Sequence, residues 1–327
     1  MSFSDRKIVV AGGAGFLGSH LCERLLNDGH KVMCIDDFST GTRENIQHLV
    51  ANKNFEYHAL DICNTKLVLG LIKSDGVGCT KGIYNLACKA SPVAYQNDPI
   101  GTLLTSFVGT KSLLDSMLGF TDSFFLQAST SEIYGEPLQH PQREDYHGNV
   151  NTVGPRSCYD EGKRVAETLC YEYTKLRCDV KIVRIFNTYG PRMQANDGRV
   201  VSNFITQALT GEDITIYGDG TQTRSFCYVD DLIDVIVKMA NTKKGFMGPV
   251  NIGNPVEFQV IELAKKVIEM TSSKSKIVFK PLPGDDPSRR KPDITLAKTK
   301  LDWTPKVSLD DGLLKTIEYF RGQGAKI

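Results

Sequence analysis

The stretch KIVVAGGAGFLG, residues 7–18, decides the fold of this chain. A short apolar run leads directly into glycines spaced as G-x-x-G-x-x-G, and a helix-length stretch follows. This order predicts a strand, a tight turn and a helix. Gly12 allows the turn, Gly15 lets a pyrophosphate approach the backbone, and Gly18 lets the helix pack against the strand. Because a helix N-terminus offers free N–H groups to phosphate oxygens, the stretch predicts a dinucleotide site.

Asp36 closes the next apolar run, 18 residues after Gly18. A carboxylate there accepts a hydrogen bond from a ribose 2′-hydroxyl and repels a 2′-phosphate. No arginine follows directly, because the next residues are Asp37, Phe38, Ser39, Thr40 and Gly41. The sequence therefore favours NAD over NADP. Asp61 and Ile62 follow a later strand and are expected to flank the adenine, with a helix N-cap as the alternative for Asp61.

Strand-length and helix-length stretches alternate through the first half of the chain. The expected strands are 7–11, 31–36, 55–59, 82–87, 123–128 and 180–186, and the expected helices are 15–28, 99–118 and 160–177. Strands separated by helices predict βαβ units, whose right-handed crossovers give a doubly wound parallel sheet. The predicted fold class is therefore α/β, with a Rossmann sheet.

After Phe186 the strands become shorter, and Pro and Gly become more frequent. The elements expected there are the strands 214–217 and 225–229 and the helices 201–209, 231–240 and 260–270. We interpret residues 1–187 as the dinucleotide-binding domain. Residues 188–327 are interpreted mainly as a smaller α/β substrate-binding lobe, with some segments returning to the Rossmann sheet. The run from Asp285 to Asp293 is expected to be a charged loop.

Composition disfavours several classes of protein. The chain has 327 residues, with 39 basic against 38 acidic side chains. This balance disfavours binding to nucleic acids or membrane surfaces through a basic face, and no apolar run approaches the ~20 residues of a membrane span. The nine cysteines include no C-x-x-C pair, and H-E-x-x-H is absent. We therefore expect reduced thiols, no metal and a cytoplasmic location.

Tyr159 and Lys163 form a Tyr-x-x-x-Lys pair at the start of a predicted helix. Their spacing places both on one helix face. A lysine ammonium and a nicotinamide cation nearby are expected to lower the pKa of the phenol, so that Tyr159 can act as a base. The same spacing recurs at Tyr171 and Lys175, where surface or packing roles are expected. The segment 129–135 distinguishes the first pair, because its hydroxyls follow a strand at the ligand edge of the sheet.

Longer runs carry a family resemblance. They are NLAC at 85–88, STSEIYG at 129–135, GNVN at 148–151, RSCYDEGKR at 156–164, RIFNTYGPR at 184–192, DGRVVSNF at 197–204, YGDG at 217–220, QTRSF at 222–226 and RKPD at 290–293. With these runs the chain resembles the extended short-chain dehydrogenase/reductase family from about Lys7 to Phe320. Within that family it is most similar to the UDP-glucuronate decarboxylases, because YDEGKR is characteristic of them.

The resemblance implies a redox cycle that closes on itself. NAD⁺ removes hydride from C4 of the glucuronic acid, the 4-ketone permits loss of CO₂, and the returning hydride gives UDP-xylose. Tyr159, assisted by Lys163, takes the hydroxyl proton. By the same resemblance Thr130 and Ser131 orient the C4 hydroxyl, and Glu132 lies near C5 as an acid, base or positioning group. Arg290 is expected to meet the carboxylate or to assist protonation.

The resemblance also implies the binding residues. Besides Tyr159, Lys163 and the residues of the glycine turn and the Asp36 segment, the expected cofactor contacts are Phe16, Leu17, Leu86, Ala87, Cys88, Thr105 and Arg192. Arg224 is a candidate for the UDP phosphates, because a guanidinium fork fits phosphate oxygens. The other expected substrate contacts are Lys89, Ser91, Tyr95, Asn187, Arg199, Val200, Asn203, Tyr217, Gln222 and Arg290, with Tyr217 beside the uracil and the two asparagines near the diphosphate.

Four positions depart from the subfamily pattern. Lys89 stands in place of a proline, Leu104 of a lysine, Ser106 of an asparagine and His147 of a tryptophan. Leu104 and Lys89 are expected to bear on the sugar pocket. We hypothesise that Lys89 restores the positive charge that Leu104 lacks.

Three alternative functions stay open. A nucleotide-hexose 4,6-dehydratase shares the oxidation at C4, a 4-epimerase needs only the Tyr/Lys site, and a silent NAD-sensing scaffold would use the same fold without turnover. Glu132, Arg290 and the Asp160–Gly162 signature favour decarboxylation. By family analogy we expect a homodimer formed through the helices 99–118 and 160–177.

Overall fold

The structure of the chain is a computed structural model, and it describes residues 6–74, 76, 79–195, 197–281 and 289–324. The expected charged loop therefore lies partly outside the described residues. Arg290, at its end, lies within them.

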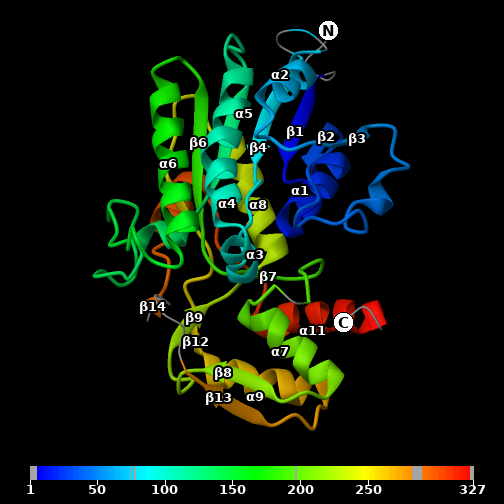
Figure 1. Ribbon diagram of the computed structural model, residues 1–327, viewed down its shortest axis with the longest axis vertical. Helices are drawn as coiled ribbons and strands as arrows, with labels where there is room; N and C mark the ends of the chain where they lie inside the picture. The colour runs from blue at the N-terminus through cyan, green and yellow to red at the C-terminus, as the bar shows by residue number, and fades with distance from the viewer. Residues whose placement is uncertain (1–5, 75, 77–78, 196, 282–288, 325–327) are drawn as a thin grey trace.

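A seven-stranded parallel sheet forms the larger part of the molecule (Figure 1). Its order is β11-β6-β5-β4-β1-β2-β3. The strands are β1 (Lys7–Ala11), β2 (Lys31–Asp36), β3 (Phe55–Ala59), β4 (Thr80–Asn85), β5 (Phe124–Thr130), β6 (Asp179–Ile185) and β11 (Val250–Ile252). The chain runs outward from β1 in both directions, so a crevice opens between β1 and β4 at their carboxyl ends.

Two layers of helices cover the sheet, because both faces of its strands are apolar. On one face α1 (Phe16–Asn27) packs beside α8 (Val229–Ala240), with α10 (Thr295–Leu301) against α8 and β11. The other face is covered by α2 (Thr65–Lys73), α5 (Thr110–Met117) and α6 (Ser157–Thr174). Among the described residues no helix is both long and apolar enough to cross a membrane.

A smaller lobe lies below the carboxyl edge of the sheet (Figure 1). Its strands are β8 (Ile214–Tyr217) paired with β13 (Ile277–Lys280), and β9 (Thr223–Ser225) between β12 (Glu257–Gln259) and β14 (Arg289–Arg290). Its helices are α7 (Val200–Thr210), α9 (Val260–Thr271) and α11 (Leu309–Gln323). The short pair β7 (Thr188–Tyr189) and β10 (Cys227–Tyr228) joins the lobe to the sheet.

The α/β fold class and the doubly wound sheet are confirmed, and β1, β2, β3 and β8 have the predicted bounds. The predicted strand 82–87 is displaced, because β4 ends at Asn85. The helix expected over 99–118 is divided into α4 (Pro99–Leu104), the π-turn η3 (Thr105–Gly109) and α5. The strand expected over 225–229 is wrong, because β9 ends at Ser225, only Cys227 and Tyr228 form β10, and α8 begins at Val229. The domain boundary at residue 187 stays a prediction.

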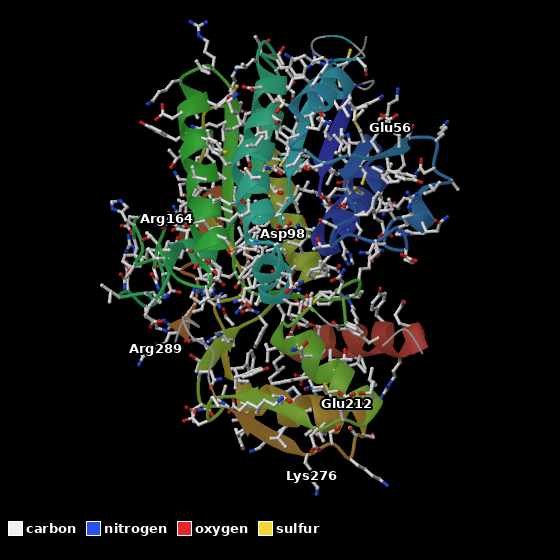
Figure 2. All side chains as sticks on the ribbon, viewed as in Figure 1. Glu56, Asp98, Arg164, Glu212, Lys276 and Arg289 are labelled. Carbon is white, nitrogen blue, oxygen red and sulfur yellow. The ribbon has the colours of Figure 1, made fainter. Side chains whose placement is uncertain are left out.

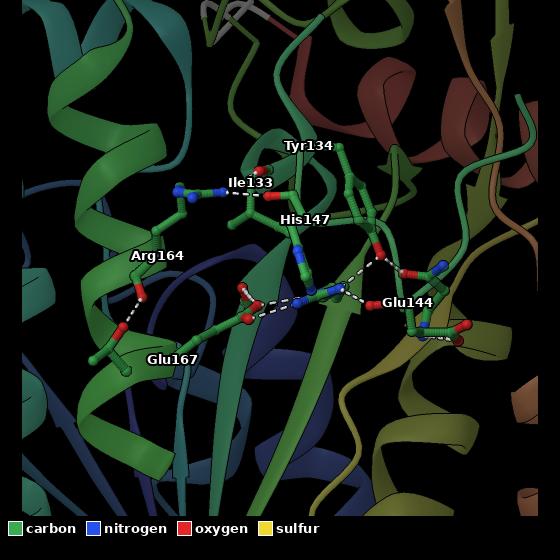
Figure 3. A network of polar contacts seen from close by, with 10 residues as sticks. Ile133, Tyr134, Glu144, His147, Arg164 and Glu167 are labelled. Atoms are coloured by element: carbon green, nitrogen blue, oxygen red, sulfur yellow. Dashed lines mark hydrogen bonds and ion pairs between the residues drawn. The ribbon is translucent and has the colours of Figure 1, made fainter. Parts of the chain in front are cut away.

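A buried polar network fixes β5, β6 and α6 relative to one another (Figure 3). Arg184 of β6 donates two hydrogen bonds to Glu167 of α6, at 3.0 and 2.8 Å, and a third to the hydroxyl of Tyr134 at 2.9 Å. Ser129 at the end of β5 donates to the same carboxylate at 2.5 Å. The Tyr134 hydroxyl donates to Asn251 of β11 at 2.7 Å. The network positions the segment after β5 against the start of α6.

Replacing Glu167 by Gln should destabilise the chain strongly. The change leaves the Arg184 guanidinium buried without its counter-charge, which typically costs about 3–5 kcal/mol. The measurement is urea unfolding followed by circular dichroism. Glu172→Gln is the matched control, because Glu172 lies on the same helix in an exposed pair with Lys175. Equal midpoints for the two variants would contradict the prediction.

Candidate active site

The glycine turn after β1 leaves no room for a side chain at Gly12 or Gly18. A Cβ on Gly12, where φ is +76°, would lie 2.7 Å from the backbone nitrogen of Ala87. A Cβ on Gly18 would lie 2.0 Å from the carbonyl oxygen of Gly12. Gly15 is the N-cap residue of α1, and no side chain caps the first turn of this helix. The first N–H groups of α1 are therefore available to an anion in the crevice.

Asp36 holds the same turn from the end of β2. Its carboxylate accepts hydrogen bonds from the backbone N–H groups of Ala14, at 2.9 Å, and Phe38, at 2.8 Å. Burial raises the pKa of Asp36 despite these bonds. A Cβ on Gly41 would lie 2.8 Å from one carboxylate oxygen, so the 36–41 segment passes close to the acid.

A cleft of about 740 Å³ lies between the carboxyl edge of the sheet and the smaller lobe. Most of the predicted site residues line it: Gly12, Gly15, Phe16, Leu17, Gly18, Thr40, Leu86, Cys88, Ser91, Tyr95, Thr130, Ser131, Glu132, Tyr159, Lys163, Asn187, Arg192, Arg199, Val200, Asn203, Tyr217, Gln222, Arg224 and Arg290. The lining does not include Asp36, Asp37, Ser39, Gly41, Asp61, Ile62, Ala87, Lys89 or Thr105.

Tyr159 and Lys163 lie in the first turns of α6 and are both buried. The Tyr159 ring stacks on Tyr95, with centroids 5.2 Å apart. The Lys163 amine lies 5.9 Å from the centre of the Tyr159 ring and donates to the Ala128 carbonyl at 2.9 Å. Tyr171, of the second Tyr-x-x-x-Lys pair, is 52% exposed. Only the first pair therefore faces the cleft.

The expected lowering of the Tyr159 pKa is not found in the chain itself. Burial raises the pKa of this phenol well above its ordinary value, and the neighbouring Cys88 and Glu132 act in the same direction. A hydrogen bond with Thr130 opposes the rise. Removing a phenol from water penalises the phenolate, and this cost exceeds the support of the polar neighbours.

Glu132 lies between two guanidinium groups. Arg156, at the start of α6, donates from Nη2 to Oε2 at 2.7 Å, and Arg290 of β14 donates to Oε1. Burial by itself would raise the pKa of Glu132, but Arg290 and Arg156 outweigh it and hold the pKa at about 2. The Glu132 carboxyl is therefore ionised throughout the physiological range.

Asp160, the residue after Tyr159, belongs to the same cluster. It is 7% exposed, and its Oδ1 has no hydrogen-bond partner among the described residues. Burial and the nearby Glu132 charge raise the pKa of Asp160 to about 7, although Arg156 and Arg290 act against the rise. The cluster thus holds one carboxyl group that is ionised and one that titrates near neutrality.

Other cations are distributed along the cleft. Arg199 forms an ion pair with Asp197 and lies 5.7 Å from the centre of the Phe16 ring. Arg192 pairs with Glu23 of α1. Arg224 donates to the Thr223 carbonyl at 2.9 Å and lies beside Arg290 in the β9–β14 register. These groups give the cleft several donors suited to an anionic ligand.

Two departures from the subfamily pattern lie away from the cleft lining. The Lys89 ammonium pairs with Asp98, which caps α4 (Pro99–Leu104). Leu104 is 46% exposed. Neither residue belongs to the lining of the cleft. The hypothesis that Lys89 supplies charge to the substrate stays a prediction, and it requires the ammonium to leave Asp98.

Arg156, Asp160 and Asp197 were not among the predicted site residues, although Asp160 belongs to the signature that favoured decarboxylation. Arg156 and Asp160 flank Tyr159 within the RSCYDEGKR run, so their positions were visible. Their pairing with Glu132 and Arg290 depends on the fold. The N-cap alternative for Asp61 is wrong, because Asn64 caps α2 and Asp61 accepts from Cys63 at 2.8 Å.

The doubly wound sheet, the glycine turn and the Tyr159–Lys163 pair define an extended short-chain dehydrogenase/reductase. The family model described as GDP-mannose 4,6 dehydratase matches residues 9–316. UDP-glucuronic acid decarboxylase 1 of Danio rerio is 48% identical over 98% of this chain and 74% of the relative. UDP-glucuronic acid decarboxylase 4 of Arabidopsis thaliana is 49% identical over 96% of this chain and 68% of the relative. The chain belongs to the UDP-glucuronic acid decarboxylase family, so the resemblance found in the sequence is confirmed.

Solved structures with the same fold include two sugar-nucleotide epimerases. The UDP-glucose 4-epimerase of Thermotoga maritima with UDP-glucose is 30% identical, with a TM-score of 0.87 over 97% of this chain and 99% of that one. The UDP-glucuronic acid 4-epimerase of Bacillus cereus, in complex with UDP-glucuronic acid and NAD, is 32% identical, with the same TM-score and coverage.

The ion pairs at Glu132 predict a pH dependence of stability. The pKa of Glu132 is about 2 in the folded chain, below its unfolded value of 4.5. The ionised carboxylate therefore contributes fully to the free energy of unfolding above pH 4.5, and this contribution is lost as the pH falls toward 2. Between pH 5 and pH 3 the free energy of unfolding of the unaltered chain should fall by about 2 kcal/mol more than that of Glu132→Gln. Urea unfolding at each pH measures the difference.

Glu212→Gln is the control for removing one negative charge, because Glu212 is exposed on the smaller lobe (Figure 2). The free energy of unfolding of Glu212→Gln should change with pH as it does in the unaltered chain. If the free energies of unfolding of Glu132→Gln and of the unaltered chain change with pH in parallel, Arg156 and Arg290 do not lower the pKa of Glu132.

Proposed function

We propose that the chain decarboxylates UDP-glucuronate to UDP-xylose, using bound NAD and restoring it within each turnover. One observation carries the proposal: a buried arginine and the Tyr159 phenol line the same cleft. Arg290 is 5% exposed, and its Nη2 has no hydrogen-bond partner among the described residues. A guanidinium nitrogen of this kind suits a carboxylate on the sugar. The names of the relatives support the same substrate.

The glycine turn fits NAD. The steric limits at Gly12 and Gly18 keep the backbone close enough for a pyrophosphate, and α1 begins without a side-chain cap. Asp36 would hold the adenosine ribose, with Phe16, Leu17, Thr40, Leu86 and Arg192 around the cofactor. When bound there, NAD⁺ would supply the group that accepts a hydride from C4 of the sugar and gives it back at the end of the cycle.

Tyr159 would exchange the proton of the C4 hydroxyl, with Lys163 keeping the phenol in place. Thr130 and Ser131 would orient that hydroxyl from the end of β5. Once C4 is a ketone, the C6 carboxylate is β to a carbonyl, so the electron pair of the C5–C6 bond can pass into an enolate as CO₂ leaves. Arg290 would hold the carboxylate beforehand. One proton then forms the new C5–H bond.

The smaller lobe would bind the UDP. Arg224 and Arg199 line the cleft there and suit the diphosphate, with Asn187 and Asn203 as further donors. Tyr217 and Gln222 would lie beside the uracil, where the Gln222 amide already donates to the Tyr217 carbonyl at 2.6 Å. The division into residues 1–187 and 188–327 is part of this proposal. A cytoplasmic location is proposed as well, because all nine cysteines are free thiols.

The central test is a proton NMR time course with UDP-glucuronate. UDP-xylose should form with release of CO₂ and without net NADH. Tyr159→Phe should lower the rate at least about hundredfold, because it removes the group that exchanges the proton. Tyr171→Phe is the matched control, since this exposed tyrosine has the same spacing to a lysine on the same helix.

The same time course identifies the alternatives. Conversion to UDP-galacturonate with all six sugar carbons retained would establish a 4-epimerase, a function favoured by the solved UDP-glucuronic acid 4-epimerase with the same fold. No reaction with UDP-glucuronate but a 4-keto-6-deoxy product from a neutral hexose would establish a dehydratase. If the chain binds NAD but turns over no sugar nucleotide, the result would favour the alternative of an NAD-sensing scaffold.

The proposed homodimer uses α4, η3 and α6. Ile100, Leu103, Leu104 and Phe107 expose apolar side chains on α4 and η3, which pack beside α6. Ile100 is 73% exposed. Such a stripe suits burial against a second copy through an isologous interface.

Replacing Ile100 and Phe107 together by Glu should convert the dimer to single chains, because two carboxylates would be buried without partners. Sedimentation velocity measures the mass. Val256→Glu is the control, because Val256 is 53% exposed on the smaller lobe. A dimer that persists in the double variant would place the interface elsewhere.

A further inference from the structure

Among the described residues, the buried cluster around Glu132 contains equal numbers of cationic groups and carboxyl groups. Arg156 and Arg290 supply two cations, and Glu132 and Asp160 supply two carboxyl groups. All four groups are at least four-fifths buried. A sugar carboxylate bound to Arg290 would add a third anion to two cations. An uncompensated charge in such surroundings is costly, and the usual response is a change of protonation.

Asp160 is the group in this cluster that is able to take a proton. Glu132 is held ionised, because each of its oxygens accepts from a guanidinium group. Asp160 has no comparable ion pair in the described part of the chain, and its buried Oδ1 lacks a partner. The groups whose charges act on or respond to Asp160 are Glu132, Arg156, Arg290, Glu161, Tyr95, Cys158 and Tyr159.

We infer that Asp160 takes up a proton when the acidic sugar binds, and that it thereby keeps Glu132 paired with both arginines beside the substrate. The inference rests on the proposed function. Asp160 does not line the cleft, so it is a positioning residue that acts through the cluster. The uptake matches the chemistry, because loss of CO₂ as a neutral molecule leaves an enolate that consumes one proton at C5. The third carboxylate disappears in the same step.

Proton uptake is measured by calorimetry of ligand binding in two buffers with different ionisation enthalpies. The NAD-loaded Tyr159→Phe variant is used, so that UDP-glucuronate binds without turnover. UDP-xylose is the reference ligand, because it has the same diphosphate and lacks the carboxylate. With a pKa of about 7, UDP-glucuronate should take up about 0.5 proton more than UDP-xylose at pH 7, and nearly one at pH 8.

The affinity for UDP-glucuronate should fall as the pH rises, because binding favours the protonated acid. Relative to UDP-xylose the fall should approach about fiftyfold between pH 7 and pH 9, the limit for a complex in which Asp160 stays protonated. Adding Asp160→Asn should abolish both the extra uptake and this fall, because the amide is neutral at every pH. Adding Asp160→Glu should retain both. Glu172→Gln is the charge control, since Glu172 forms an exposed pair with Lys175 on the same helix and is not among the groups that act on Asp160.

Equal proton uptake for the two ligands in the unaltered cluster would overturn the inference without any Asp160 variant, so it stays testable if Asp160→Asn does not fold. Extra uptake that persists in Asp160→Asn would overturn it as well. These results are separate from a failure of the proposed function, in which UDP-glucuronate does not bind or the unaltered chain releases no CO₂. Binding and turnover with equal uptake contradict only the role of Asp160.

Discussion

Two ion pairs on the Glu132 carboxylate connect the parts of the site. One runs to Arg156 at the start of α6, and the other runs to Arg290 on β14 of the smaller lobe. Glu132 itself follows β5 in the sheet. Because the three charges are largely removed from water, separating them is costly, and the edge of the sheet, the helix with Tyr159 and the second lobe are held in one arrangement.

Much of the sheet could be predicted from sequence because its signals are local. The bounds of β1 follow from an apolar run that ends at glycine, and those of β2 follow from an apolar run that ends at the carboxylate of Asp36. The elements that were displaced or divided depend on contacts between distant residues. Gly109 in the π-turn shows this, because a Cβ there would lie 2.5 Å from Ile62 of another segment.

Some features of the candidate site are also visible in the sequence, and others depend on the fold. Tyr159 and Lys163 have a spacing that is visible in the sequence, and the cleft contains both. The direction of the Tyr159 pKa could not be predicted, because burial is a property of the folded chain. Asp160 illustrates the same limit. Its residue type was known, but the charged groups around it come from the segment after β5, from β14 and from the start of α6, which only the fold brings together.

The register of β14 against β9 places Arg290 opposite Arg224 on neighbouring strands. Adjacent strands lie about 4.8 Å apart, and backbone hydrogen bonds fix that spacing. In the proposed complex one arginine serves the carboxylate end of the ligand and the other serves the diphosphate end. The pairing of β9 with β14 therefore sets the separation at which the two guanidinium groups are anchored. In the proposed complex, this separation would have to match the distance between the two anionic ends of the ligand.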